Sequence, residues 1–406
     1  MTQQHFQHPD LSSLDSDRKH TWESTMTGKP DGRYIRAHKD PVLYIPFDPD
    51  MTHTLVSGAL CDLRARFELE EYTFSPSATF SRELQPSVFS SLIGGLRKSD
   101  LPLGDLDFRT RFEHDRDSIL HSEPFRRLAG KTQVHLNPDD HQRTRLTHAL
   151  EVTQIARALA QALRLNVALT EAIALGHDCG HGPGGHASED AFEPYLSGGF
   201  NHATFGADVT LRSLDLNPET LDGIRNHSWS LNTPATPEAE VVSFADRIAY
   251  VCHDLEDALA CNMISRRDFP NDLAAFMNHT RGDQIGYFIR AVIQGSLNSG
   301  SIAILKEYGE LLGAMRSFNN EKIYHHKISR EQNVSVIQTL SELVDFYCYH
   351  TDLLPERFQR CIREDGQGSV EAVVEYVAGM TDDFAYRCHD QYVKNASDAP
   401  STPSLI

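Results

Sequence analysis

Residues 144–164 read TRLTHALEVTQIARALAQALR, and this stretch predicts an amphipathic helix. Four of its apolar residues recur at three- and four-residue steps: Val152, Ile155, Leu159 and Leu163. Such spacing places them on one face of a helix, which then packs against the rest of the protein. His148 falls on the same stripe, four residues before Val152. We therefore expect a core helix with an imidazole on its buried face.

Two more helical segments carry ionisable side chains. Residues 167–178 form a short apolar period that ends at His177 and Asp178, just before a glycine-rich turn. Glycines end helices and let the backbone turn sharply. A longer period covers residues 238–261. On it Asp246, Tyr250 and Asp254 follow one another at four-residue steps, so they share a stripe that differs from its apolar core face.

The whole pattern predicts an all-α protein, because helical periods continue from about residue 105 and recur near 300–317, 333–349 and 369–380. We expect a helical core over 101–262, a C-terminal helical region over 263–394 and a tail over 395–406. Residues 1–100 form an N-terminal extension that is punctuated by Asp, Pro, Ser and Gly, and we assign no chemistry to it. Within it, residues 40–50 are a candidate strand, and the first 30 or so residues are expected to be disordered.

Composition limits the class of protein. The 406 residues are 40% hydrophobic and 23% charged, which is typical of a globular protein. No apolar run approaches the ~20 residues that span a bilayer, and the polar N-terminus lacks a signal core. We therefore expect a cytoplasmic protein without membrane contact. The seven cysteines are odd in number and contain no C-x-x-C, which indicates reduced thiols and no zinc finger.

The net charge of −19 is unevenly distributed. From Arg97 to Arg164 there are 12 basic and 10 acidic residues, so this stretch is +2 and the rest of the chain is −21. We expect an anion-binding site near the basic stretch, although ordinary surface salt bridges would explain many of these charges. The acidic total argues against a broad nucleic-acid footprint and leaves a local groove as an alternative.

Four residues form a candidate metal-binding set: His148, His177, Asp178 and Asp246. Two imidazoles and two carboxylates suit Mn²⁺, Fe²⁺, Mg²⁺ or Zn²⁺ and leave coordination positions open for water and substrate. Each residue lies on an otherwise apolar or small-residue helix, where an unpartnered polar group is costly to bury, and a shared cation removes that cost. Taken singly, a histidine on a helix stripe is more often a hydrogen-bonded core residue than a metal ligand, and a His-Asp dipeptide is common.

At these residues the chain closely resembles the deoxyguanosine triphosphate triphosphohydrolase family of HD proteins. The resemblance is carried by RTRLTHALEVTQIAR (143–157), ALGHDCGHGPGGHASED (174–190) and FADRIAYVCHDLEDA (244–258). DRDSILHSEPFRRLAGKTQVH (115–135) and VVEYVAGMTDDFAYRCHDQY (373–392) are similar to the family's N- and C-terminal signatures. The likeness runs from about 105 to 392 in motif order. It implies an HD-domain helical core with the four metal ligands named above.

The resemblance also implies a catalytic pair, His186 and Glu189. If a helix begins there, residues three apart share a face, and a carboxylate beside an imidazole orients it and favours its protonated form. A protonated His186 could then donate to a departing 5′-oxygen. The alternative for Glu189 is a helix-start carboxylate stabilised by the dipole, a role that Ser188 or Asp190 could share.

Substrate contacts are implied in the same way. Arg145, His181, His202 and Arg247 resemble the family's triphosphate-facing residues, and a triphosphate with about four negative charges requires clustered cations. Tyr250, Asp254 and Gln133 resemble its sugar-side residues. An Asp that accepts from the 3′-hydroxyl, beside an aromatic ring at C2′, would disfavour ribose. The alternatives are surface salt bridges for Arg145 and Arg247, and a solvated acidic face for Asp254.

The implied activity is hydrolysis of deoxynucleoside triphosphates at the α-phosphorus, which releases a deoxynucleoside and inorganic triphosphate. The implied cofactor is one divalent metal per site, Mn, Mg, Fe or similar. The resemblance further implies a homo-oligomer and nucleotides as allosteric activators. The alternatives are an HD phosphohydrolase of another phosphoester, such as a monophosphate or alarmone, and a non-catalytic nucleotide-binding regulator. The absence of GxxxxGK[ST] argues against a P-loop enzyme.

Two departures from the family pattern leave the preferred base open. Gly182 and Gly184 stand where many relatives carry Pro and Phe. The segment FNHATFGADV keeps His202 but lacks the Asn and Gln that often follow it. Neither departure touches a predicted metal ligand.

Overall fold

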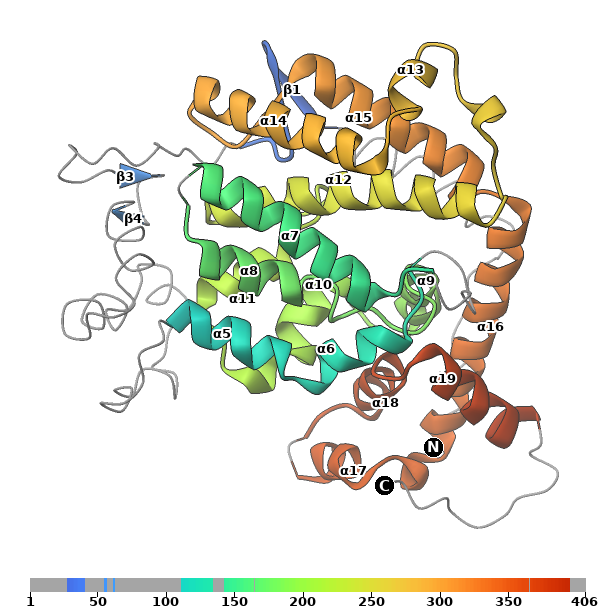
Figure 1. The fold of residues 1–406 in the computed structure, drawn as a ribbon. Coiled ribbons are helices and arrows are strands. Elements are labelled where there is room, and N and C mark those ends of the chain that lie inside the picture. Colours follow the sequence, from blue (N-terminus) through green and yellow to red (C-terminus); the bar gives the residue numbers. More distant parts are fainter. Residues whose placement is uncertain are drawn as a thin grey trace.

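Helices make up most of the described chain, which confirms the predicted all-α class (Figure 1). The computed structural model describes residues 28–40, 111–133, 142–163, 165–364 and 366–394, and the backbone of 55–56 and 61–62. The α-helices of this part are α5 Arg111–Leu120, α6 Glu123–Arg127, α7 Arg145–Leu163, α8 Val167–Gly176, α9 Ala187–Phe192, α10 His202–Phe205, α11 Pro218–Arg225, α12 Pro237–Ala260, α13 Ala274–Met277, α14 Arg281–Ser299, α15 Lys306–Asn319, α16 Lys327–Tyr349, α17 Glu356–Arg363, α18 Ser369–Ala378 and α19 Asp382–His389. The described helices include none that is long and apolar enough to cross a membrane.

The three helices that carry the predicted metal ligands or lead to them are α7, α8 and α12, and they pack on one another. On α7 the predicted apolar stripe is fully buried. Burial of each such side chain contributes about 1.5–3 kcal/mol relative to exposure. Asn166 caps α8 by accepting a hydrogen bond from Leu169 N, and Thr236 caps α12 in the same way from Ala239 N. These caps set where each helix begins.

One predicted helix starts later than expected. Residues 301–305 are extended instead of helical, and β5, Ile304–Leu305, precedes α15. β5 pairs antiparallel with β2, Tyr34–Arg36, which in turn pairs with β1, Lys29–Asp31. The sheet order is β1-β2-β5. The prediction failed here because the extended backbone is stabilised by a strand about 270 residues away, which local periodicity does not report.

Part of the N-terminal extension is therefore joined to the helical core. Besides the strand pairing, the His38 imidazole donates to the Glu240 carboxylate of α12 at 2.9 Å, and both side chains are buried. Two further short strands, β3 Leu55–Val56 and β4 Cys61–Asp62, pair with each other. The expected disorder of about the first 30 residues falls largely, and the candidate strand at 40–50 almost entirely, outside the described residues, as does the tail.

The buried apolar side chains of the described residues form two cores. The larger core is formed by α5, α7, α8, α12, α14 and α15 with neighbouring segments. The smaller core is formed by α9, α16, α18 and α19 with the turns between them. α9 packs on α16, so the segment that follows the glycine-rich turn is held by the C-terminal region.

Gly180 allows α10 to approach the turn that follows α8. A Cβ at this position would overlap the carbonyl oxygen of His202 and the backbone of Gly206, neither of which is a movable side-chain end. We expect Gly180→Ala to lower the free energy of unfolding by about 1–3 kcal/mol or more, because overpacked backbone must shift. The control is Gly198→Ala, whose Cβ would meet nothing within 4 Å. Thermal unfolding of both variants checks this, and equal melting temperatures would contradict it.

Candidate active site

Three helices bring the four predicted metal-binding residues to one point. His148 is the fourth residue of α7, His177 and Asp178 follow the end of α8, and Asp246 lies in α12. His148 Nε2 is 3.1 Å from Asp246 Oδ1. His177 Nε2 is 3.5 Å from Asp178 Oδ1 and 3.7 Å from Asp246 Oδ1. One donor atom each from His148, His177 and Asp178 all lie within 4.8 Å of one another.

The orientation of His177 favours a cation at this point. Its Nδ1 lies 2.7 Å from the carbonyl oxygen of Ala174, and a carbonyl only accepts, so the proton is on Nδ1. In the neutral ring the lone pair is then on Nε2, which is buried and has no hydrogen-bond partner among the described residues. A second ring nitrogen held in this way is the usual arrangement for a metal-binding histidine.

Both carboxylates of the set are held as anions. Burial alone would raise the pKa of Asp246, but the hydrogen bond from His148 and the nearby imidazole of His177 lower it to about 2. Burial is likewise outweighed at Asp178, where His177 and the guanidinium of Arg145 hold the pKa well below its usual range. Arg145 itself is buried and donates to Asp178 Oδ2 at 2.9 Å. Two nitrogen and two oxygen donors therefore fit a divalent cation.

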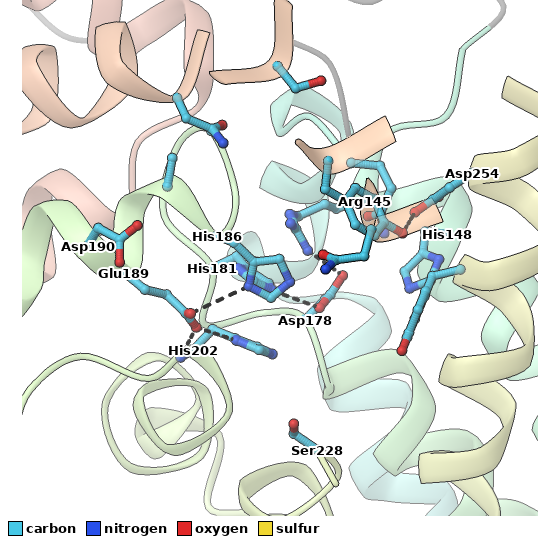
Figure 2. A pocket seen from close by; sticks show the side chains of 18 of the residues that line it. Arg145, His148, Asp178, His181, His186, Glu189, Asp190, His202, Ser228 and Asp254 are labelled. Carbon is cyan, nitrogen blue, oxygen red and sulfur yellow. Dashed lines mark hydrogen bonds and ion pairs between the residues drawn. The ribbon is translucent and has the colours of Figure 1, made fainter. Parts of the chain in front are cut away.

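The predicted catalytic pair is present, with His202 as a third member (Figure 2). Glu189 lies in the first turn of α9, and its Oε2 is 3.4 Å from His186 Nδ1. Its Oε1 accepts from His202 Nδ1 at 2.6 Å and from the His202 backbone N–H at 3.1 Å. Glu189 is thus both a helix-start carboxylate and the acceptor between two imidazoles.

His186 is the member of this cluster that opens to the pocket, with 44% of its side chain exposed. Desolvation by the surrounding protein lowers the pKa of the His186 imidazole, whereas the hydrogen bond to Glu189 and the charge of Glu189 act in the opposite direction. With no anion bound the pKa of His186 therefore lies below its usual value.

His181 joins the metal-binding set to this cluster. Its Nε2 lies 3.2 Å from Asp178 Oδ1, and its ring stacks on that of His202 with the centroids 3.7 Å apart. Burial, with Arg145 and His202 nearby, holds the pKa of His181 well below its usual range. The ring is therefore neutral.

A pocket of about 400 Å³ unites these groups. All of the predicted site residues line it except His177 and Arg247. His177 is fully buried beneath the pocket. Arg247 is also buried, and its guanidinium lies over the Trp229 ring, 3.7 Å from the centroid. Arg247, which the sequence analysis names among the triphosphate contacts, is not among the described residues that line the pocket.

The predicted sugar-side residues line another part of the pocket. Asp254 Oδ2 accepts from the hydroxyl of Tyr324, and Oδ1 is buried without a hydrogen-bond partner in the described chain. Burial raises the pKa of Asp254 to about 7, against the effect of the Tyr324 hydrogen bond. The Tyr250 hydroxyl and Gln133 Oε1 likewise have no partner in the described part of the chain.

Several lining residues were not predicted from the sequence. They are His227, Asn320, Tyr324, His325, Arg330 and Asn333 among others. Apart from His227, they come from the segment that joins α15 to α16 and from the start of α16. The sequence feature that could have indicated these lining residues is the polar run NNEKIYHHKISREQN at 319–333, directly before an apolar helical period. Nothing in that run indicates which face meets the metal-binding set.

Comparison with known proteins finds two families that match segments of this chain. The HD domain family matches residues 145–251, and the phosphohydrolase-associated domain family matches residues 302–391. A deoxyguanosinetriphosphate triphosphohydrolase-like protein of Caldanaerobacter subterraneus subsp. tengcongensis is 40% identical over 78% of this chain and 91% of its own length. One of the same name from Desulfatibacillum aliphaticivorans is 34% identical over 80% and 95%. The chain belongs to the deoxyguanosinetriphosphate triphosphohydrolase-like family of HD-domain proteins.

Membership of this triphosphohydrolase-like family supports a phosphohydrolase. HD domains bind divalent metals, and the four-residue set lies within the matched HD segment. A crystal structure of a hypothetical protein from Aquifex aeolicus is also similar, at 18% identity and a TM-score of 0.41 over 70% of this chain and 68% of that one.

The metal-binding set predicts the effect of removing one carboxylate. We expect Asp246→Asn to lose bound Mn²⁺, because the variant keeps the shape of the side chain but removes an anionic ligand. Asp272→Asn, at an exposed position, is the matched control. Elemental analysis after dialysis against Mn²⁺ measures the bound metal. Unchanged Mn²⁺ in Asp246→Asn would contradict the assignment.

Metal binding by this set is expected to weaken as pH falls. Although burial opposes it, the hydrogen bond that His148 donates to Asp246 and the charge of Asp178 raise the pKa of His148. The metal-free site therefore holds a proton on His148 to a higher pH than a free imidazole does, and a cation must displace it. Calorimetric titration with Mn²⁺ should show affinity falling as pH decreases through that raised pKa, with proton release on binding. Binding without proton release would count against this account.

Proposed function

We propose that this chain hydrolyses deoxynucleoside triphosphates to a deoxynucleoside and inorganic triphosphate in a metal-dependent reaction. The observation that carries the proposal is the placement of two groups in one pocket. The metal-binding set and the His186–Glu189 pair face the same space, and His181 lies between them. The curated relatives, which are named for triphosphohydrolysis of deoxyguanosine triphosphate, support the same substrate class.

Triphosphate binding is assigned to the groups around His181. Arg145 provides a fixed positive charge whose orientation is set by Asp178. His181 and His202 line the same wall. A triphosphate carries about four negative charges, which would raise the pKa of His181 and make its ring a donor on binding. A cation held by the four-residue set would supply Lewis-acid polarisation of a phosphoryl oxygen. Arg247 is left out of this assignment because it is not among the described residues that line the pocket.

The sugar is assigned to the wall formed by α12. Asp254 Oδ1 is buried at the pocket without a partner among the residues described, so an incoming 3′-hydroxyl would satisfy it. Tyr250, one turn earlier on the same helix, would pack against C2′. A ribose 2′-hydroxyl would crowd that ring, which favours deoxynucleotides.

Proton transfer to the departing 5′-oxygen is assigned to His186. Glu189 orients the ring through Nδ1, which leaves Nε2 toward the substrate. The imidazole has a lowered pKa in the free protein, and the negative charge of a bound triphosphate would raise it. Substrate binding would thus help to protonate the general acid. The homo-oligomer and allosteric activation by nucleotides remain predictions from the family resemblance, and the cytoplasmic location remains a prediction from the sequence composition.

Product identity tests the reaction. Each of the four deoxynucleoside triphosphates is incubated with Mn²⁺ or Mg²⁺, singly and mixed, and the products are separated by ion-exchange chromatography. We expect free inorganic triphosphate and a deoxynucleoside in equal amounts. Orthophosphate or pyrophosphate would instead support a different HD phosphoesterase. Turnover in the mixture alone would indicate activation by a nucleotide.

The role of His186 predicts a specific kinetic change. His186→Ala should lower kcat by about 10²- to 10⁴-fold, the usual contribution of a general acid, and leave Mn²⁺ binding intact. His121→Ala, at an exposed position after α5, is the control. A variant that keeps wild-type kcat would remove His186 from the mechanism.

A further inference from the structure

One carboxylate outside the pocket holds two of the pocket's walls. Asp382 lies in the first turn of α19 and is buried. Its Oδ1 accepts from the backbone N–H of Gly184 at 2.8 Å, and its Oδ2 accepts from the backbone N–H of Thr132 at 2.9 Å. Asp382 is not among the described residues that line the pocket. Asp382 therefore contacts the walls of the pocket through the backbone N–H groups of Gly184 and Thr132.

The first backbone segment is the catalytic turn, which we define as residues 181–186. Gly184 and Gly185 have φ of +70° and +64°, a region open to glycine and rarely adopted by other residues. Such a turn has wide conformational freedom before folding, so its native form needs contacts from outside. His186 follows two residues after the amide that Asp382 holds.

The second segment leads to the phosphate and sugar walls. Thr132 forms an isolated antiparallel bridge with Thr144, and the backbone of Lys131 accepts from Arg145 N at 3.0 Å. Gln133, the next residue, lines the pocket. The position of Thr132 is thereby tied to the start of α7, where Arg145 lies.

Two more contacts hold residues 130–132 against the catalytic turn and the C-terminal helices. The buried ammonium of Lys131 donates to the carbonyl oxygen of His181 in the catalytic turn and, at 2.9 Å, to that of Ala378 at the end of α18. A Cβ on Gly130 would overlap the side chain of Thr381, which caps α19. The C-terminal region thus contacts residues 130–132 and the catalytic turn at one place.

We propose that Asp382 is a positioning residue that fixes the catalytic turn relative to Arg145, so that the C-terminal helices set the geometry of the chemistry. This inference rests on the proposed function. Its physical basis is that a displacement of about 1 Å in a reacting group can cost about 10²-fold in rate. The carboxylate has two acceptor oxygens, and each is used by one wall of the pocket.

The test compares Asp382→Asn with Asp383→Asn. Asn keeps the shape of Asp382 but has one acceptor oxygen, so one of the two backbone N–H groups would face an NH₂ group. Asp383 is the exposed neighbour in the same helical turn, which matches the change in charge at the helix start. Hydrogen exchange is measured on peptides that cover 181–189 and 130–134, together with kcat, KM and bound Mn²⁺.

We expect Asp382→Asn to exchange faster in these peptides, to lose kcat by about 10- to 100-fold and to keep KM within a few-fold and Mn²⁺ unchanged. Asp383→Asn should match the wild type. Unchanged exchange, or faster exchange with wild-type kcat, overturns the proposal. If Asp382→Asn does not fold, Lys131→Met must show the same pattern, because it removes the hydrogen bonds from Lys131 to the carbonyl oxygens of His181 and Ala378. If the wild type releases no triphosphate, the proposed function fails, and exchange alone decides whether Asp382 holds the turn.

Discussion

The structure depends on the burial of two imidazoles and two carboxylates where α7, α8 and α12 meet. Apolar packing drives these helices together, and His148, His177, Asp178 and Asp246 lie at the junction. Their mutual contacts offset part of the cost of burial, yet His177 Nε2 is still without a partner among the described residues. A divalent cation at this point would satisfy the remaining donors, and the rest of the pocket is arranged around it.

The pocket is built by two parts of the chain that are far apart in sequence. The matched HD segment supplies the candidate metal-binding set, Glu189 and Tyr250, and Asp254 follows it on the same helix, α12. The C-terminal helices supply another wall through the start of α16 and hold α9 through their own apolar core. The match to a phosphohydrolase-associated domain over 302–391 covers this second part. Residues of this second segment therefore line the same pocket as residues of the HD segment.

Local patterns predicted the helices and the candidate metal-binding set, whereas the family resemblance implied the catalytic pair and the substrate contacts. The stripe on α7 and the His177–Asp178 pair at a helix end are local features, so spacing alone reported them. The β2–β5 pairing and the second bond of Glu189 to His202 depend on contacts between distant segments, which periodicity does not encode. Arg247 follows a metal-binding residue directly, yet the helix turns it toward Trp229, because neighbours in sequence point about 100° apart on a helix.

The most direct measurement is an anomalous difference map from crystals loaded with Mn²⁺. The account predicts a single strong peak among His148, His177, Asp178 and Asp246. The cluster of His181, His186, Glu189 and His202 also has donor atoms within 4.8 Å of one another, and it provides an internal comparison. A peak at that second cluster, with none among the first four residues, would contradict the central claim.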